Sequence, residues 1–126
     1  MPTTTKPDHR LRRHADYQRV YRDARRNSGR QMSWFAALRR DDYIPATESP
    51  RIGITVPKAI GNAVVRNRIK RRLRALIARH ITVLTLPIDV VLHPRRTAAE
   101  IEFSTLDADL AQIFARIQKD FSQQAK

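Results

Sequence analysis

The chain has no cysteine in its 126 residues. This absence excludes disulfide bonds, thiolate nucleophiles and cysteine-based metal sites, and it fits a reducing compartment. The sequence also lacks a run of about 18 apolar residues, the length that a membrane-spanning helix requires, and its polar start, MPTTTKPDHR, has no apolar segment typical of a signal peptide. We therefore expect a cytoplasmic protein with a disordered basic lead-in over residues 1–10 and a single domain over residues 11–126.

Acidic residues are scarce. The chain has 12 Asp and Glu against 25 Lys and Arg, which gives a net charge of +13 and a pI near 11.4. This excess is far more than solubility requires, so an anionic polymer is the expected partner, and a nucleic acid fits best. A membrane surface is the competing anion, but the most basic segment carries no Trp or Phe anchors, and we expect no membrane role.

Catalytic side chains are also lacking. A two-metal nuclease needs carboxylates gathered around ions roughly 3.5–4 Å apart, whereas the acids here are scattered. Their only local concentration is Glu100, Glu102, Asp107 and Asp109, and the last two suit the N-terminal end of a predicted helix, where the macrodipole favours negative charge. The four histidines show no i,i+4 pair and no carboxylate partner for acid–base chemistry. We expect neither a catalytic residue nor a metal site in the protein itself.

The most informative segment is VPKAIGNAVVRNRIKRRLR, residues 56–74, which has six basic residues between Arg66 and Arg74. At about 100° per residue, one stripe of the predicted helix 62–78 is apolar and comprises Val65, Ile69, Leu73, Leu76 and Ile77. Asn62 is the expected N-cap. A solvated face usually mixes charges of both signs, but here the outward face is cationic without a carboxylate. The pattern favours a helix that binds a polyanion.

The remaining periodicities outline an α/β domain. Helical spacing over residues 14–24 places Tyr17, Val20 and Tyr21 on one face, and alternation predicts strands over 31–38, 52–56 and 88–93. The second and third strands flank the basic helix, so they form a β-α-β unit with parallel strands. A last amphipathic helix follows, with Ser104 and Asp107 at capping-box spacing before its apolar stripe.

One motif carries a family resemblance. Arg66-Asn67-Arg68 follows Lys58 and Gly61-Asn62-Ala63-Val64 and precedes Lys70-Arg71, and this arrangement resembles the protein subunit of bacterial ribonuclease P. The order of the predicted elements agrees over residues 10–121. The resemblance implies an α/β mixed sandwich, with a central mixed sheet of about four strands, helices packed on it, and a β-α-β crossover around the basic helix.

The resemblance also implies a function. The chain would be the protein component of the ribonuclease P ribonucleoprotein, binding the catalytic RNA and the 5′ leader of precursor tRNA to promote endonucleolytic maturation of the tRNA 5′ end. Catalysis would be carried by the RNA subunit, with Mg²⁺ held by that RNA and the substrate and not by a protein site. The implied partners are the catalytic RNA and precursor tRNA, and no protein partner is implied.

The implied sites lie on two elements. The candidate RNA-binding residues belong to the basic helix and the turn before it: Lys58, Asn62, Arg66, Asn67, Arg68, Lys70, Arg71, Arg72 and Arg74. Tyr17 and Tyr21 would line a leader-binding cleft between the sheet and the first helix, where stacking on rings tolerates any base sequence; alternatively, both tyrosines are core residues. The chain departs from the family pattern at Pro57, Ala59 and His93, which puts RNA contacts at 57–59 and 93 in doubt.

Two other functions remain open at this point. The chain could be an RNA-binding module of a ribosomal or other ribonucleoprotein with no link to tRNA processing. It could also be an independent metal nuclease, which would cleave RNA without an RNA partner.

Overall fold

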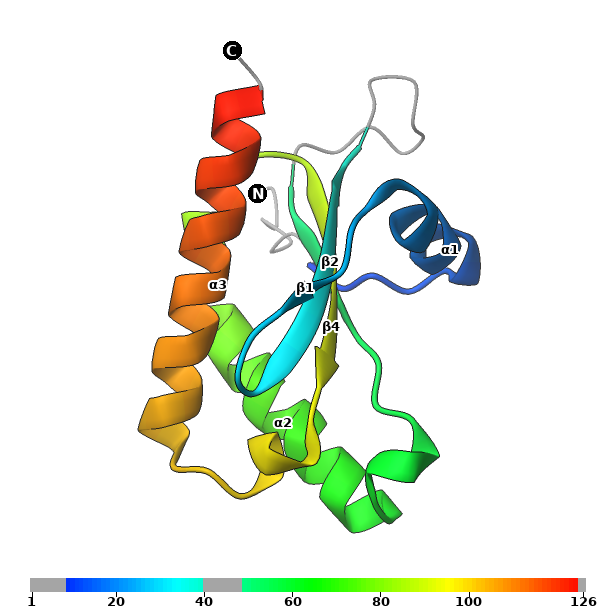
Figure 1. Ribbon diagram of the computed structural model, residues 1–126, viewed down its shortest axis with the longest axis vertical. Helices are drawn as coiled ribbons and strands as arrows, with labels where there is room; N and C mark the ends of the chain where they lie inside the picture. Colours follow the sequence, from blue (N-terminus) through cyan, green and yellow to red (C-terminus); the bar gives the residue numbers. More distant parts are fainter. Residues whose placement is uncertain (1–8, 40–48, 125–126) are drawn as a thin grey trace, which may run out of the picture.

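A four-stranded mixed sheet separates two layers of helices in the computed structural model, which describes residues 9–39 and 49–124 (Figure 1). The strands are β1 (Asn27–Ser28), β2 (Met32–Leu38), β3 (Arg51–Ile54) and β4 (Ile88–Pro94), in the spatial order β1-β2-β4-β3. β2 pairs antiparallel with β1 and β4, and β3 pairs parallel with β4. The expected mixed sheet of about four strands is therefore confirmed.

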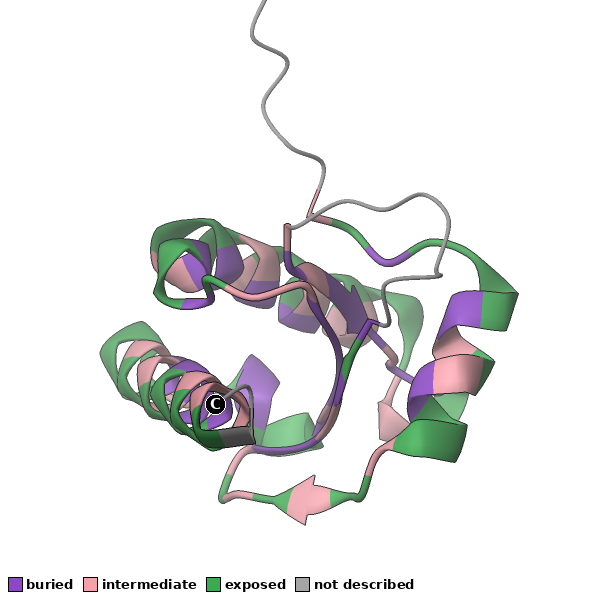
Figure 2. Cartoon of the chain, turned by 90° about the horizontal axis from the view of Figure 1, so that it is seen from above, coloured by how far each residue is buried: buried purple, intermediate pink, exposed green. Residues whose placement is uncertain are grey.

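Helices cover both faces of this sheet. Helix α1 (His14–Asp23) lies on one face, and α2 (Ala63–His80) and α3 (Phe103–Gln124) lie together on the other, as the view along the molecule shows (Figure 2). Three short 3₁₀ helices, η1 (Lys58–Ile60), η2 (Ile81–Val83) and η3 (Arg96–Ala99), lie in the connections. None of the helices among the described residues is long and apolar enough to cross a membrane.

The main core fills the space between the sheet and helices α2 and α3. Alternate residues of β2 and β4, such as Met32, Val90 and Leu92, point toward these helices and are fully buried. Ile69 and Leu73 of α2 meet them and are also 0% exposed. The apolar stripe predicted for the basic helix is thus confirmed as its core face.

The predicted β-α-β unit is also confirmed. β3 and β4 run parallel in the register from Arg51 opposite Asp89 to Ile54 opposite Leu92, and α2 connects them. The Asn62 side chain accepts a hydrogen bond from the Val65 backbone N–H at 3.0 Å, so it caps α2 as expected. The helix continues to His80, two residues beyond the predicted end.

Three details of the predicted layout are wrong. Strand β1 was not predicted, because two residues are too few to show an alternation. Helix α3 begins at Phe103, so Ser104 lies inside its first turn and does not form the N-terminal half of a capping box. The lead-in was expected to extend through residue 10, but the backbones of residues 9–11 pair with Ile52 of β3. Residues 1–8 of that segment lie outside the described part of the chain.

Candidate RNA interface

The outward face of α2 is the first candidate surface. Asn67, Arg68 and Arg71 are exposed, and Arg66, Lys70, Arg72 and Arg74 are half-buried around them. Lys58 and Asn62, both exposed, lie in η1 and at the helix cap, so they extend this surface beyond the N-terminal end of α2. The structure thus brings together all nine candidate residues on one helix and the turn that leads into it.

Some of these arginines also support the fold. The Arg72 guanidinium donates to the backbone carbonyl of Ala98 at 2.7 Å and to that of Ile101, which ties α2 to η3 and to the segment between η3 and α3. Burial and the neighbouring charge of Arg68 lower the pKa of Arg72. Arg66 Nε donates to the Gly61 carbonyl at 3.2 Å. The donors of Arg72 face the protein, which leaves Asn67, Arg68 and Arg71 as the most accessible group for a polyanion.

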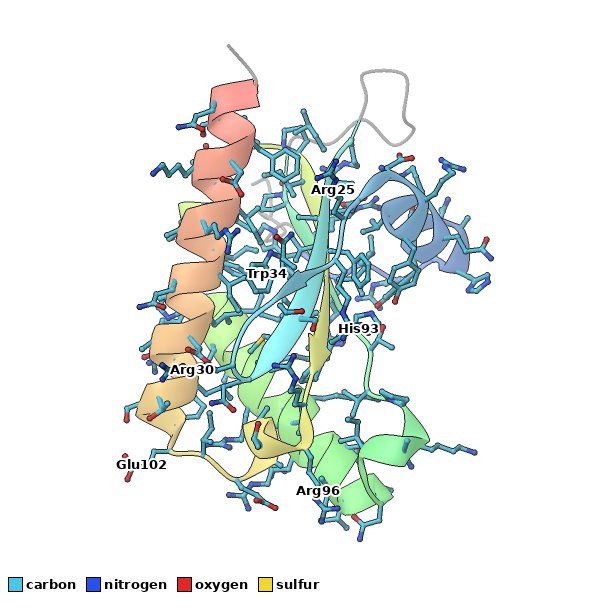
Figure 3. All side chains as sticks on the ribbon, in the orientation of Figure 1. Arg25, Arg30, Trp34, His93, Arg96 and Glu102 are labelled. Atoms are coloured by element: carbon cyan, nitrogen blue, oxygen red, sulfur yellow. The ribbon has the colours of Figure 1, made fainter. Side chains whose placement is uncertain are left out.

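A cluster of three aromatic rings forms the second candidate surface, on the sheet face that carries α1. Tyr21 of α1, Phe35 of β2 and His93 of β4 have ring centroids 5.0 to 5.6 Å apart, and Tyr21 packs edge-on against both partners. The Tyr21 hydroxyl lies 2.9 Å from His93 Nε2. In Figure 3, His93 lies on the α1 side of the sheet, opposite Trp34. We call these three residues the ring cluster.

The ring cluster includes two residues that the sequence argument did not place in a site. Phe35 was predicted only as a strand residue, and contact by His93 was left in doubt. The strand alternation already put Phe35 on the opposite side from Trp34, so the missing information was the β2–β4 register. That register places His93 directly opposite Ser33, the next residue along β2 on the same face as Phe35.

The environment of His93 favours its neutral form. Burial lowers its pKa below the ordinary value of 6.5, and the nearby positive charge of Arg26 lowers it further. The ring therefore presents an uncharged imidazole beside Tyr21 and Phe35. Tyr21 is 37% exposed, so the cluster has an accessible aromatic edge that a base could stack against.

Tyr17 has a different environment from Tyr21. Its ring is half-buried, packed against the smaller core of Leu11, Val20, Ala37 and Val91, and its hydroxyl donates to the Leu11 carbonyl at 3.1 Å. A Cβ at Gly53 would lie 2.6 Å from Tyr17 Cζ, so only glycine allows the ring to lie over β3 here. Burial raises the pKa of Tyr17, and the charge of Tyr21 adds to this effect. Tyr17 holds α1 on the sheet, and Tyr21 carries the more accessible ring.

A buried ionic cluster ties α1 to the sheet through Asp16 and Arg19. The Asp89 carboxylate, 0% exposed in β4, accepts hydrogen bonds from Arg19 of α1, Arg39 and Arg51. Arg51 also contacts Asp16 of α1 at 3.4 Å. Burial opposes the charge of Arg51, but the hydrogen bonds and charges of Asp89 and Asp16 outweigh it and raise its pKa. The cluster thus ties α1 to strands β3 and β4.

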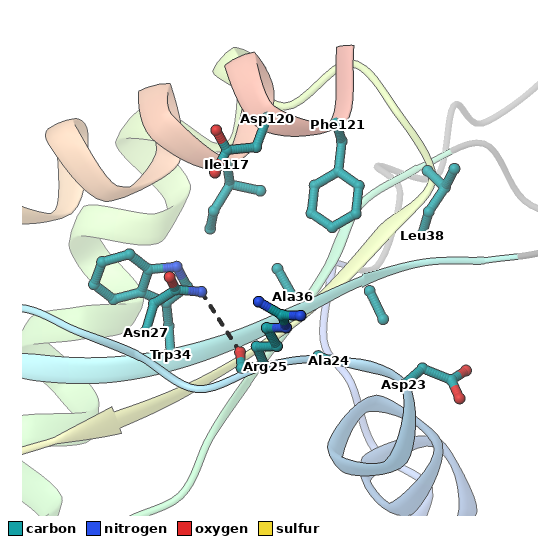
Figure 4. Close-up of a pocket in the computed structure, with 11 residues that line it drawn as sticks. Asp23, Ala24, Arg25, Asn27, Trp34, Ala36, Leu38, Ile117, Asp120 and Phe121 are labelled. Atoms are coloured by element: carbon teal, nitrogen blue, oxygen red, sulfur yellow. Dashed lines mark hydrogen bonds between the residues drawn. The ribbon is translucent and has the colours of Figure 1, made fainter. Parts of the chain in front are cut away.

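A hollow of about 560 Å³ lies on the other face of the sheet, between α3 and strands β1 and β2 (Figure 4). Trp34, Ile117 and Phe121 supply its apolar wall, and Asp23, Arg25 and Asp120 stand at its polar edge. Its charges are mixed, unlike the basic face of α2. No group of three His, Asp or Glu side chains among the described residues could hold a metal ion. Asp107, which belongs to the only local concentration of acids, is instead bound to Arg79 and His80.

Together, the fold and its two surfaces define a small α/β protein with a cationic helix and an aromatic ring cluster, an arrangement suited to a nucleic acid. A family model described as Ribonuclease P matches residues 5–118. The chain belongs to the ribonuclease P protein family.

Individual relatives agree with this assignment. The chain is 32% identical over 116 residues to the ribonuclease P protein component of Acidothermus cellulolyticus, covering 92% of this chain and 93% of the relative. It is 35% identical over 113 residues to that of Bacillus cereus, covering 88% and 92%. Its structure matches the Staphylococcus aureus RNase P protein with a TM-score of 0.74 at 26% identity, covering 89% and 97%. The RNase P protein from Thermotoga maritima has the same fold, with a TM-score of 0.72 at 22% identity over 85% and 96%.

Proposed function

We propose that this chain is the protein component of ribonuclease P and promotes maturation of the tRNA 5′ end by binding two RNAs at once. One is the catalytic RNA and the other is the single-stranded 5′ leader of precursor tRNA. The RNA subunit carries out the cleavage, with Mg²⁺ held by that RNA and the substrate. Family membership over nearly the whole chain favours this role over a ribosomal protein or an independent nuclease.

The catalytic RNA is assigned to the basic face of α2. Asn67, Arg68 and Arg71 are exposed on a helix that has no carboxylate from Ala63 to His80. Because like charges repel one another on this face, neutralisation by phosphates would relieve the repulsion and release counterions. Phosphate contacts of this kind position a protein on RNA without reading its sequence.

The leader is assigned to the ring cluster, and this is the observation that carries the proposal. Tyr21, Phe35 and His93 form an aromatic surface beside α1, on the sheet face opposite α3, in which Tyr21 is exposed and the other two rings are half-buried. A base that stacks there gains about 1–3 kcal/mol whatever its identity, which suits leaders of many sequences. On this proposal Tyr17, named with Tyr21 by the family motif, acts mainly by holding α1 in place.

The test uses the complex reconstituted with ribonuclease P RNA and a ladder of precursor tRNAs with leaders from none to several nucleotides. Tyr21→Ala should weaken substrate affinity by about 1–3 kcal/mol once the leader is long enough to reach the ring. Affinity for mature tRNA should be almost unchanged. A deficit of equal size with no leader would mean that Tyr21 acts through the fold and would contradict the leader assignment.

Phe103→Ala is the matched control. Phe103 is also 37% exposed, but its ring lies at the start of α3, against Arg72 and Arg79. Its loss removes an equally accessible ring from a different surface. Any effect of Phe103→Ala should therefore be the same for every leader length.

A further inference from the structure

An arginine stands beside the ring cluster in the turn between α1 and β1. The Arg26 guanidinium donates to the Ser33 hydroxyl of β2 at 3.2 Å, and that hydroxyl lies 3.4 Å from the hydroxyl of Ser28 in β1. Ser33 is 1% exposed, whereas Arg26 is exposed. Arg26 is thus held at one end by a buried hydroxyl while its remaining N–H donors are accessible.

The held arginine lies next to the aromatic surface. Ser33 is directly opposite His93 in the β2–β4 ladder, and Phe35 is the next residue of β2 on the same face. The charge of Arg26 is felt at the His93 ring. Within the described part of the chain, no carboxylate forms an ion pair with Arg26, so its charge is available to a ligand.

We propose that Arg26, positioned by Ser33, binds a backbone phosphate of the leader nucleotide whose base stacks on the ring cluster. This inference rests on the proposed function and adds the phosphate contact to it. A planar guanidinium fork matches phosphate geometry, and Arg26 has donors to spare after its bond to Ser33. A basic group beside stacking rings is the usual design of a site for single-stranded nucleic acid.

Rings and arginine have separate tasks at this site. Stacking holds a base but leaves the strand free to slide by one nucleotide, because every base has a similar face. A phosphate contact beside the rings adds a second point of attachment for the nucleotide that stacks there. It acts on leaders of any sequence, because every nucleotide carries the same phosphate.

Arg25 provides a matched control from the adjacent position. It is also an exposed arginine, but it lines the hollow between α3 and the strands on the opposite side of the sheet (Figure 4). Arg25→Ala and Arg26→Ala remove the same charge from neighbouring positions. Only Arg26→Ala removes a charge from the ring-cluster side.

The experiment measures affinity of the reconstituted complex for precursor tRNAs in which one leader phosphate at a time is replaced by an uncharged methylphosphonate. With the parent protein, one leader position should lose about two- to fivefold in affinity, as expected for an accessible ion pair. Arg26→Ala should show the same loss with the unmodified leader and no further loss at that position. Its salt dependence should also flatten, by about 0.7 in the log–log slope for one phosphate of a single strand. Arg25→Ala should behave like the parent.

Two results would overturn the inference. If every methylphosphonate affects the parent and Arg26→Ala equally, Arg26 does not bind a leader phosphate. If Arg26→Ala weakens binding to mature tRNA or to the catalytic RNA by the same factor, it contacts another RNA. In either case the leader-length dependence of Tyr21→Ala would still stand. If the affinity of the parent complex for precursor tRNA did not depend on leader length, the proposed function itself would be refuted.

Discussion

Replacing Asp89 with Asn perturbs the contact that holds α1 over the sheet. The Asp89 carboxylate accepts from Arg51 at 2.9 and 2.7 Å, from Arg39 at 2.5 Å and from Arg19. Its side chain is 0% exposed, that of Arg39 is 2% exposed, and those of Arg19 and Arg51 are each 14% exposed. Asparagine has nearly the same shape but no charge, so the substitution removes the carboxylate that these three largely buried arginines share.

The expected cost is large because Arg39 is buried and the side chains of Arg19 and Arg51 are only 14% exposed, so water solvates these charges poorly once the carboxylate is gone. Breaking a buried ion pair by removing one partner destabilises a protein by about 3–5 kcal/mol, and here one carboxylate serves three partners. A domain has roughly 5–15 kcal/mol of stability in total. At roughly 3–5 °C per kcal/mol for a domain of this size, the melting temperature should fall by roughly 10 °C or more.

Urea unfolding followed by circular dichroism measures this loss, with Asp120→Asn as the control. Asp120 is 56% exposed and lies 3.9 Å from Arg116, so its loss should cost at most about 1 kcal/mol. If Asp89→Asn unfolds within about 1 kcal/mol of the parent, the ionic cluster does not hold α1. Comparable losses for the two variants would contradict the same reasoning.

Three further predictions concern the helix faces, the β3 glycine and the histidine of the ring cluster. Leu73→Ala should cost about 2–5 kcal/mol of stability. Arg68→Ala should leave the melting curve unchanged and flatten the salt dependence of binding to the catalytic RNA. If Arg68→Ala unfolded the protein and Leu73→Ala did not, the assignment of the buried and exposed faces of α2 would be wrong. Gly53→Ala should cost about 1–3 kcal/mol of stability by displacing the Tyr17 ring. This cost should be smaller in a Tyr17→Ala background. Strictly additive costs in this double-mutant cycle would show that residue 53 and the Tyr17 ring do not touch. His93 has a lowered pKa when folded, so the unfolded chain takes up its proton first as pH falls below about 6.5. His93→Gln should therefore lose less stability than the parent between pH 7 and pH 5 in parallel urea titrations, and equal losses would contradict the assigned direction.

Local patterns predicted the elements whose structure depends on neighbouring residues. The apolar stripe of α2 and its Asn62 cap could be predicted because both lie within a few turns of one helix. The parallel pairing of β3 with β4 followed from the helix between them. The basic face needed no tertiary information, since the same periodicity that buries Leu73 exposes Arg68.

The parts that were missed depend on residues far apart in the sequence. Arg19 meets Asp89 across 70 positions, and no local spacing indicates that contact. Phe35 joins His93 only through the β2–β4 register. The start of α3 was misplaced because Ser104 and Asp107 suggested a capping box, whereas the helix begins at Phe103 and Asp107 binds Arg79 and His80 of α2. The hydrogen bond from His80 lowers the pKa of the Asp107 carboxyl; burial opposes this shift, and the hydrogen bond and charge of Arg79 add to it.

Reconstitution tests the central claim most directly. Rigorously RNA-free protein, ribonuclease P RNA alone, and the two combined are each incubated with precursor tRNA in Mg²⁺, and release of the 5′ leader is followed under single-turnover conditions. The account predicts no cleavage by the protein alone and, with the RNA, a gain in substrate affinity that grows with leader length. Cleavage by the RNA-free protein at the rate of the complex would contradict the account. So would a complex that binds precursor tRNA no more tightly than the RNA alone.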